Sequence, residues 1–199
     1  MHSPEDVRLT CVDLAERLAA MDDRQERADA FEAELDGLPA EVRYVIDLMI
    51  QKEVDHKTYV NDLLRDKPGF STERMKPHDY SKDSLFCFVM SLRFDCDTRT
   101  DAMLKLVADE FQRHYTLEAH HPEYELVHNE ECSTLDILEM AIDRLSRNVQ
   151  RNDGDLNMAQ IQYQPQFPLG DNDTKQKMYL GFVAKYSDFV QAAYIPIID

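Results

Sequence analysis

The sequence predicts an all-α protein, and three observations support this prediction. Glycine is rare, with 5 residues in a chain of 199, so few positions interrupt a helix. Apolar residues recur at intervals of three and four along several long stretches, as in helices that bury one face. Alternating patterns typical of strands are absent apart from the polar stretch 160–164. With 43% hydrophobic residues, the chain can bury a sizeable core.

Two helices are expected before residue 39. Ser3 and Pro4 fit the N-cap and the first position of the first helix. A second, charged helix is expected at 24–35, before a turn that contains glycine and proline. We interpret residues 1–38 as an N-terminal helical extension that packs on the main domain, residues 39–199.

The main domain is expected to consist of further helices joined by polar loops. The helix expected at 40–65 carries His56 close to its core-facing arc. Ser133 and Asp136 form a capping box at the start of another helix. The polar, proline-containing stretch 150–173 is expected to be a lid or a surface loop. The other expected helices are 78–92, 102–115, a short helix or turn before Asn129, 133–149 and 174–194.

Composition restricts the partners and the compartment. The formal charge of −17, from 22 Lys and Arg against 39 Asp and Glu, repels a phosphate backbone, so duplex nucleic acid is not an expected partner. A small anionic substrate is compatible with it if metal ions line the pocket. The four cysteines are scattered, no signal peptide is evident, and no apolar run approaches the roughly 20 residues that span a bilayer. We expect a cytoplasmic protein without a membrane partner; a homo-oligomer is compatible with the sequence.

The dipeptide His78-Asp79 is the centre of the functional interpretation. A histidine beside an aspartate can bring an imidazole nitrogen and a carboxylate oxygen to one divalent metal. Taken singly, each candidate has an ordinary reading: His56 as a boundary histidine, or Asp143 as a carboxylate paired with a neighbouring arginine. Their order on successive helices favours a metal site instead. The candidate ligands are His56, His78, Asp79, His114, His120, His121 and Asp143.

The order of these residues resembles that of the HD-domain metal-dependent phosphohydrolases, all-helical proteins named for their His-Asp pair. Four fragments are also similar to a small HD-like family of unknown function, and together they span about residues 50–150. One departure is the Pro-Glu-Tyr-Glu segment 122–125, where that family often has an aromatic-rich stretch. The four fragments are HKTYV at 56–60, HDYSK at 78–82, His114 with five residues before His120-His121, and EMAIDR at 139–144.

The resemblance implies an HD-domain-like helical bundle and a centre of one or two metals. The first metal would be held by His56, the His78-Asp79 pair and Asp143, and Asp79 could bridge to a second. His114, with His120 or His121, would complete the second site, and the sequence leaves open which of the two adjacent histidines takes part. The cofactor would be a divalent metal: Fe, Mn, Mg, Co, Ni or Zn.

The activity that the resemblance implies is hydrolysis of a small phosphorylated metabolite, with nucleotides the commonest substrates among HD relatives. The metals would make hydroxide available near neutral pH. The candidate catalytic residues are Asp79, Lys82 as a phosphate ligand and Glu123 as a proton shuttle. For Lys82, an ordinary solvated lysine near a helix start is an equally good interpretation. Arg144 and Arg147 are weaker candidates for binding the phosphate. Glu118 is the alternative candidate for the proton shuttle.

Two other functions fit the same residues. Some HD-like proteins with histidine-rich dinuclear sites hold two irons and use dioxygen to oxidise C–H or C–P bonds, and His114 with His120-His121 keeps this oxygenase alternative open. The other alternative is a non-catalytic helical protein with a structural metal site, which binds another protein through its acidic surface.

Overall fold

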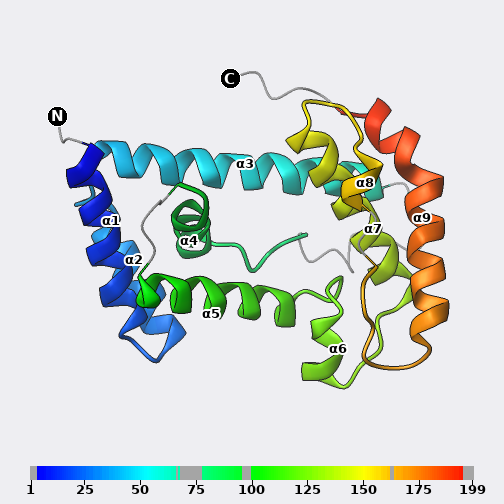
Figure 1. Ribbon diagram of the computed structural model, residues 1–199, viewed down its shortest axis with the longest axis horizontal. Helices are drawn as coiled ribbons and strands as arrows, with labels where there is room; N and C mark the ends of the chain where they lie inside the picture. Colours follow the sequence, from blue (N-terminus) through cyan, green and yellow to red (C-terminus); the bar gives the residue numbers. More distant parts are fainter. Residues whose placement is uncertain (1–3, 66, 68–77, 96–99, 162–163, 195–199) are drawn as a thin grey trace. The chain divides into compact units, whose positions relative to one another are not determined.

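The computed structural model describes residues 4–65, 67, 78–95, 100–161 and 164–194 (Figure 1). Within these residues the protein is all-α, with nine helices and no strand, which confirms the predicted fold class. None of these helices combines the length and the apolar character needed to cross a bilayer. The helices are α1 Pro4–Ala19, α2 Arg24–Leu35, α3 Ala40–Arg65, α4 Ser84–Asp95, α5 Asp101–Leu117, α6 Glu123–His128, α7 Thr134–Arg151, α8 Met158–Ile161 and α9 Asn172–Ala192.

The chain divides into two compact units. The first comprises Met1–Val54 and Ser81–His114, and the second comprises Asp55–Tyr80 and Tyr115–Asp199. The division falls within α3 and α5, so it does not coincide with the domain boundary predicted after residue 38. The helices of the predicted N-terminal extension share a core with the first part of α3 and with α4 and α5, so they pack on the rest of the chain as expected.

The core of the first unit explains why α1 and α2 belong to it. Leu14 and Leu18 of α1 are fully buried. Phe31 of α2 stacks on Phe88 of α4, with ring centroids 5.1 Å apart. Arg24, at the start of α2, donates to both oxygens of the buried Glu110 on α5. Apolar and ionic contacts therefore fasten these helices to one another.

Helix α4 begins later than predicted. The sequence predicts a helix from residue 78, but residues 78–81 form a turn and α4 starts at Ser84. Asp83 caps α4, because its Oδ1 accepts a hydrogen bond from the backbone N–H of Phe86 at 3.1 Å. Lys82 therefore precedes the helix.

The second unit is built around the contact between α7 and α9 (Figure 1). The predicted capping box is present: the Ser133 side chain accepts from the backbone of Asp136, and Asp136 accepts from that of Ser133. The apolar face of α7 packs against Tyr179 and Val183 of α9. The stretch 150–173, predicted as irregular, contains the short helix α8. One face of α7 is thus packed in the core of the second unit, and another face carries the polar residues described in the next section.

Candidate metal centre

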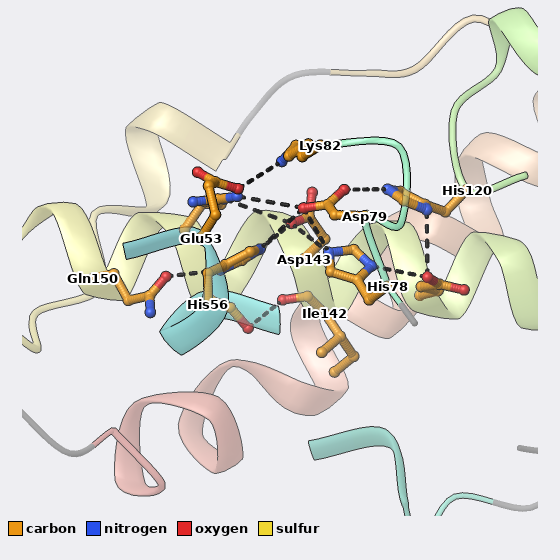
Figure 2. Close-up of polar contacts among 12 residues, drawn as sticks. Glu53, His56, His78, Asp79, Lys82, His120, Ile142, Asp143 and Gln150 are labelled. Atoms are coloured by element: carbon orange, nitrogen blue, oxygen red, sulfur yellow. Dashed lines mark hydrogen bonds and ion pairs between the residues drawn. The ribbon is translucent and has the colours of Figure 1, made fainter. Parts of the chain in front are cut away.

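Four side chains of the second unit converge: His56 from α3, His78 and Asp79 from the turn, and Asp143 from α7. Each offers one ligand atom, and these atoms all lie within 4.8 Å of one another (Figure 2). Asp143 Oδ1 lies 2.8 Å from His56 Nε2 and 3.2 Å from His78 Nε2. Asp79 Oδ2 lies 3.9 Å and 3.4 Å from the same two nitrogens. The structure therefore brings together the four residues that the resemblance to HD-domain proteins assigns to a first metal.

These separations fit a metal ion. Ligands about 2.1 Å from a cation lie about 3.0 Å apart at neighbouring octahedral positions and about 3.4 Å apart at tetrahedral positions. The four N···O distances, from 2.8 to 3.9 Å, bracket both values. Two imidazoles and two carboxylates are ligands that Mn, Fe, Co, Ni and Zn accept. The donor set and its spacing therefore fit one divalent cation.

The turn at 78–81 is what lets two consecutive residues face the same point. Successive residues of a regular helix point about 100° apart, whereas the turn at 78–81 directs both His78 and Asp79 into the cluster. Asp79 has a φ of 58°, in the left-handed region that residues other than glycine rarely adopt. Its side chain is only 1% exposed. Such backbone strain is often found at functional sites.

One stripe of α7 supplies the other polar groups around the cluster. Glu139, Asp143, Arg147 and Gln150 follow one another at intervals of four, four and three residues, so they lie along one side of the helix. The neighbouring apolar stripe of α7 is packed in the core of the second unit. A capped and packed helix therefore fixes the spacing of these groups.

The two histidines of the cluster are oriented in the same way. Nδ1 of His56 lies 2.8 Å from Gln150 Oε1, and Nδ1 of His78 lies 2.8 Å from Glu139 Oε1. In both rings the Nε2 atom faces Asp143. A neutral imidazole carries a single N–H, but here both nitrogens of each ring face an oxygen acceptor. A second positive centre at Nε2, either a proton or a metal ion, would satisfy both contacts of each ring.

The surroundings move the pKa values of these two histidines in opposite directions. Burial lowers the pKa of His56 to about 4, and the positive charge of Arg147 contributes in the same direction. Burial would also lower the pKa of His78, but the charge of Asp79 and the hydrogen bonds to Asp143 and Glu139 outweigh it and raise the pKa to about 10. Without metal, His56 is therefore neutral at pH 7 and His78 carries a proton.

His120 has the same orientation as the first two histidines. Its Nδ1 lies 3.3 Å from Glu139 Oε1, and its Nε2 lies 3.7 Å from Asp79 Oδ1 (Figure 2). The two oxygens of Asp79 therefore face different groups, with Oδ2 toward His56 and His78 and Oδ1 toward His120. A carboxylate placed in this way can bridge two cations.

The remaining histidines differ in their placement. His121 is half-buried, packs against the rings of Tyr115 and His120, and has a ring nitrogen within 4.8 Å of a carboxylate oxygen of Asp79. His120 is the buried member of the double histidine. His114 belongs to the first unit, where its Nδ1 lies 2.8 Å from the hydroxyl of Ser81. Its participation in a second metal site stays a prediction.

The structure places the other candidate catalytic residues, Lys82 and Glu123, and the alternatives Glu118 and Arg147, as follows. Lys82 lies in the first unit, with its Nζ 3.2 Å from Glu53 Oε2, so its charge is paired there. Glu123 is the first residue of α6 and is half-buried, and Glu118 is buried. Arg147 lies beside the cluster, with Nη2 3.4 Å from Asp79 Oδ2. The catalytic roles of Lys82 and Glu123 stay predictions.

Sequence reasoning missed two residues that orient the cluster, Glu139 and Gln150. Glu139 precedes Asp143 by four residues and Gln150 follows it by seven, so helical spacing places all three on one stripe. With Asp143 as a candidate ligand, this helical spacing is the sequence signal that points to both residues. Neither residue is easily predicted to orient a histidine from the sequence, because each contacts a histidine that lies far away along the chain.

Metal binding should release protons from this centre. Because His78 carries a proton below about pH 10 and a ligand must give it up, metal affinity should rise with pH. We expect an increase of about tenfold per pH unit between pH 6 and 8 for each proton released. Isothermal titration of metal-free protein in buffers of different ionisation enthalpy measures the protons released. An affinity that is independent of pH over this range would contradict the assignment of His78 as a ligand.

The candidate metal centre lies within a segment that matches a known family. No curated protein and no solved structure matches the chain. The model of a family of unknown function matches residues 47–180, which contain the four residues of the cluster and the α7 stripe. This match covers more than half of the chain. The chain therefore belongs to DUF5662, a family of unknown function.

Proposed function

We propose that this protein is a metal-dependent phosphohydrolase that acts on a small phosphorylated metabolite, with nucleotides as the first candidates. The observation that supports this most strongly is the convergence of two imidazole nitrogens and two carboxylates within 4.8 Å. A divalent cation held by these residues would lower the pKa of a bound water toward neutral pH, and it would neutralise negative charge on a phosphate oxygen. The resemblance to HD-domain phosphohydrolases points to the same class of reaction.

The accessible edge of the cluster indicates where a substrate would approach. His56, His78 and Asp79 have side-chain exposures of 0 to 1%. Asp143 and Arg147, both on the α7 stripe, keep 14% and 22% of their side-chain surface exposed. A substrate phosphate would therefore reach the metal along this stripe.

Arg147 is the residue of the second unit that we assign to the substrate phosphate. Its guanidinium lies 3.4 Å from Asp79 Oδ2 and 3.9 Å from Asp143 Oδ1. Because the same carboxylates would coordinate the metal, their negative charge would then be shared between the cation and the guanidinium. A guanidinium at the edge of such a centre can bind two phosphate oxygens in a fixed geometry. Lys82 and Glu123 remain further candidates for phosphate binding and proton transfer.

Replacing Arg147 should weaken phosphate binding. We expect Arg147→Gln to raise the KM for a phosphorylated substrate, and the inhibition constant of inorganic phosphate, by about tenfold, the loss of one charged hydrogen bond of roughly 1.5 kcal/mol. The matched control is Arg144→Gln, because Arg144 is exposed on the same helix. Steady-state kinetics on both variants measure the difference. Equal effects of the two substitutions would argue against a specific role for Arg147.

The proposed activity can be tested directly. Protein purified without a metal-affinity column should release phosphate from at least one member of a panel of nucleotides and phosphomonoesters when Mn²⁺, Fe²⁺, Co²⁺, Ni²⁺, Zn²⁺ or Mg²⁺ is added. Asp79→Asn should abolish this release while the protein stays folded. If no compound of the panel released phosphate in a metal-dependent way, the proposal would be wrong. Lost stability of Asp79→Asn, with no activity to lose, would instead favour a structural metal site.

A di-iron oxygenase is the second candidate, and the placement of His120 favours it. His120 offers a third Nε2, on the side of Asp79 that faces away from His56 and His78. Three imidazoles around a bridging carboxylate suit iron as well as the metals of hydrolases. Iron in the protein as isolated, with an electron paramagnetic resonance signal that changes on exposure to oxygen, would support this function. A protein that contains only Mg or Mn would count against it.

A further inference from the structure

One carboxylate oxygen contacts two histidine rings. Glu139 Oε1 lies 2.8 Å from Nδ1 of His78 and 3.3 Å from Nδ1 of His120. The two rings lie close together, with centroids 4.6 Å apart and an angle of 34° between their planes. We infer that Glu139 is a positioning residue shared by two metal positions, because it orients one ligand of each. This inference rests on the metal centre of the proposed function, but not on the reaction.

The orientation of the rings follows from the chemistry of the carboxylate. An ionised carboxylate only accepts hydrogen bonds, so the Nδ1 atoms that face it carry the hydrogen. In the neutral ring that binds a metal, the lone pair is then at Nε2, on the opposite edge. For His78 this atom lies 3.4 Å from Asp79 Oδ2, and for His120 it lies 3.7 Å from Asp79 Oδ1. Glu139 therefore directs the two rings to different oxygens of the same aspartate.

Glu139 and Gln150 should influence metal affinity at different positions, and this difference can be tested. Gln150 contacts Nδ1 of His56, which belongs to the first metal position only. Glu139 contacts a ligand of the first position and a ligand of the second. Loss of such an outer partner typically lowers metal affinity by about 10- to 100-fold. Glu139 should thus influence both positions, and Gln150 should influence one.

The two rings and Glu139 also permit another arrangement. One ring nitrogen of His78, one of His120 and a carboxylate oxygen of Glu139 lie within 4.8 Å of one another, so these three groups could themselves surround a cation. The 2.8 Å contact between Nδ1 of His78 and Oε1 is a hydrogen-bond distance, and the Nε2 edges face the Asp79 carboxylate that would be shared. These contacts favour Glu139 as the orienting group.

The experiment uses Mn²⁺ titrations of the full chain, followed by electron paramagnetic resonance of free Mn²⁺. In a His120→Ala background, which keeps the first position, both Glu139→Gln and Gln150→Leu should lower the affinity by about 10- to 100-fold. In a His56→Ala background, which keeps the second position, Glu139→Gln should lower it by the same factor and Gln150→Leu should leave it unchanged. An effect of Glu139→Gln in only one background, or the same stoichiometry in wild type and His120→Ala, would overturn the inference.

A second measurement needs no substitution at Glu139 and therefore holds if that variant fails to fold. Long-range ¹⁵N–¹H spectra of histidine-labelled protein loaded with Zn²⁺ report which nitrogen of each ring carries hydrogen and which binds metal. We expect Nδ1–H and metal-bound Nε2 for both His78 and His120. Metal at Nδ1 of either ring would overturn the inference in favour of Glu139 as a ligand. None of these readouts involves turnover, so absence of hydrolysis would remove the proposed function alone.

Discussion

Asp143→Asn should remove metal binding at the first position and, with it, the metal-dependent release of phosphate. Asp143 Oδ1 faces Nε2 of both His56 and His78, so this carboxylate would be a ligand of the metal that both histidines bind. Loss of an outer partner alone costs about 10- to 100-fold in metal affinity, so loss of this shared ligand should cost at least about 100-fold. Mn²⁺ titration and phosphate-release assays on the same preparation measure both effects.

The control for Asp143→Asn is Asp155→Asn, in the same unit. Asp155 is exposed, so the substitution removes the same charge from the chain without touching the cluster. It should leave both metal affinity and phosphate release unchanged. Circular dichroism should show that both variants keep their helices. If Asp143→Asn bound Mn²⁺ as tightly as wild type, the cluster would not be the metal site.

Glu125→Leu should destabilise the protein by about 3 to 5 kcal/mol, because it removes the nearest partner of the buried Lys175 ammonium and leaves the largely exposed Glu131, 3.3 Å away, as its ion-pair partner. The Glu125 side chain is 0% exposed, and its Oε1 lies 2.5 Å from Nζ of Lys175 on α9. The two carboxylate oxygens also accept the backbone N–H groups of Cys132 and Leu169, at 2.7 and 2.9 Å. The Glu125 side chain therefore connects α6 to Lys175 of α9, to the segment before α9 and to the segment before α7. Urea denaturation measures the change in the free energy of unfolding.

A double variant separates the ion pair from the general effect of substitution. Glu125→Leu combined with Lys175→Met removes both charges and should recover part of the lost stability, because a buried pair replaced by apolar groups is often near neutral. Glu130→Gln, at an exposed position just beyond α6, should change the free energy by less than about 0.5 kcal/mol. A cost below about 1 kcal/mol for Glu125→Leu would mean that the ion pair contributes little.

Local signals in the sequence were sufficient for much of the helical architecture. The bounds predicted for α2 and α3, 24–35 and 40–65, are those observed, because apolar periodicity and terminal signals act within a few residues. The capping box of Ser133 and Asp136 is likewise a local pattern. The predicted start of α4 at residue 78 was wrong. Asp83 caps a helix that starts at Ser84, and the preceding turn places His78 and Asp79 in the cluster.

The sequence by itself determined which residue types could bind a metal, and their order along the chain. Only the tertiary structure decided how they are used: that Glu139 and Gln150 orient the histidines, that Arg147 lies beside Asp79, and that His120 is the buried member of its pair. The contacts responsible join residues 61 and 94 positions apart. Helical periodicity gives the face on which a side chain lies, but the partner that this face meets depends on how whole helices pack.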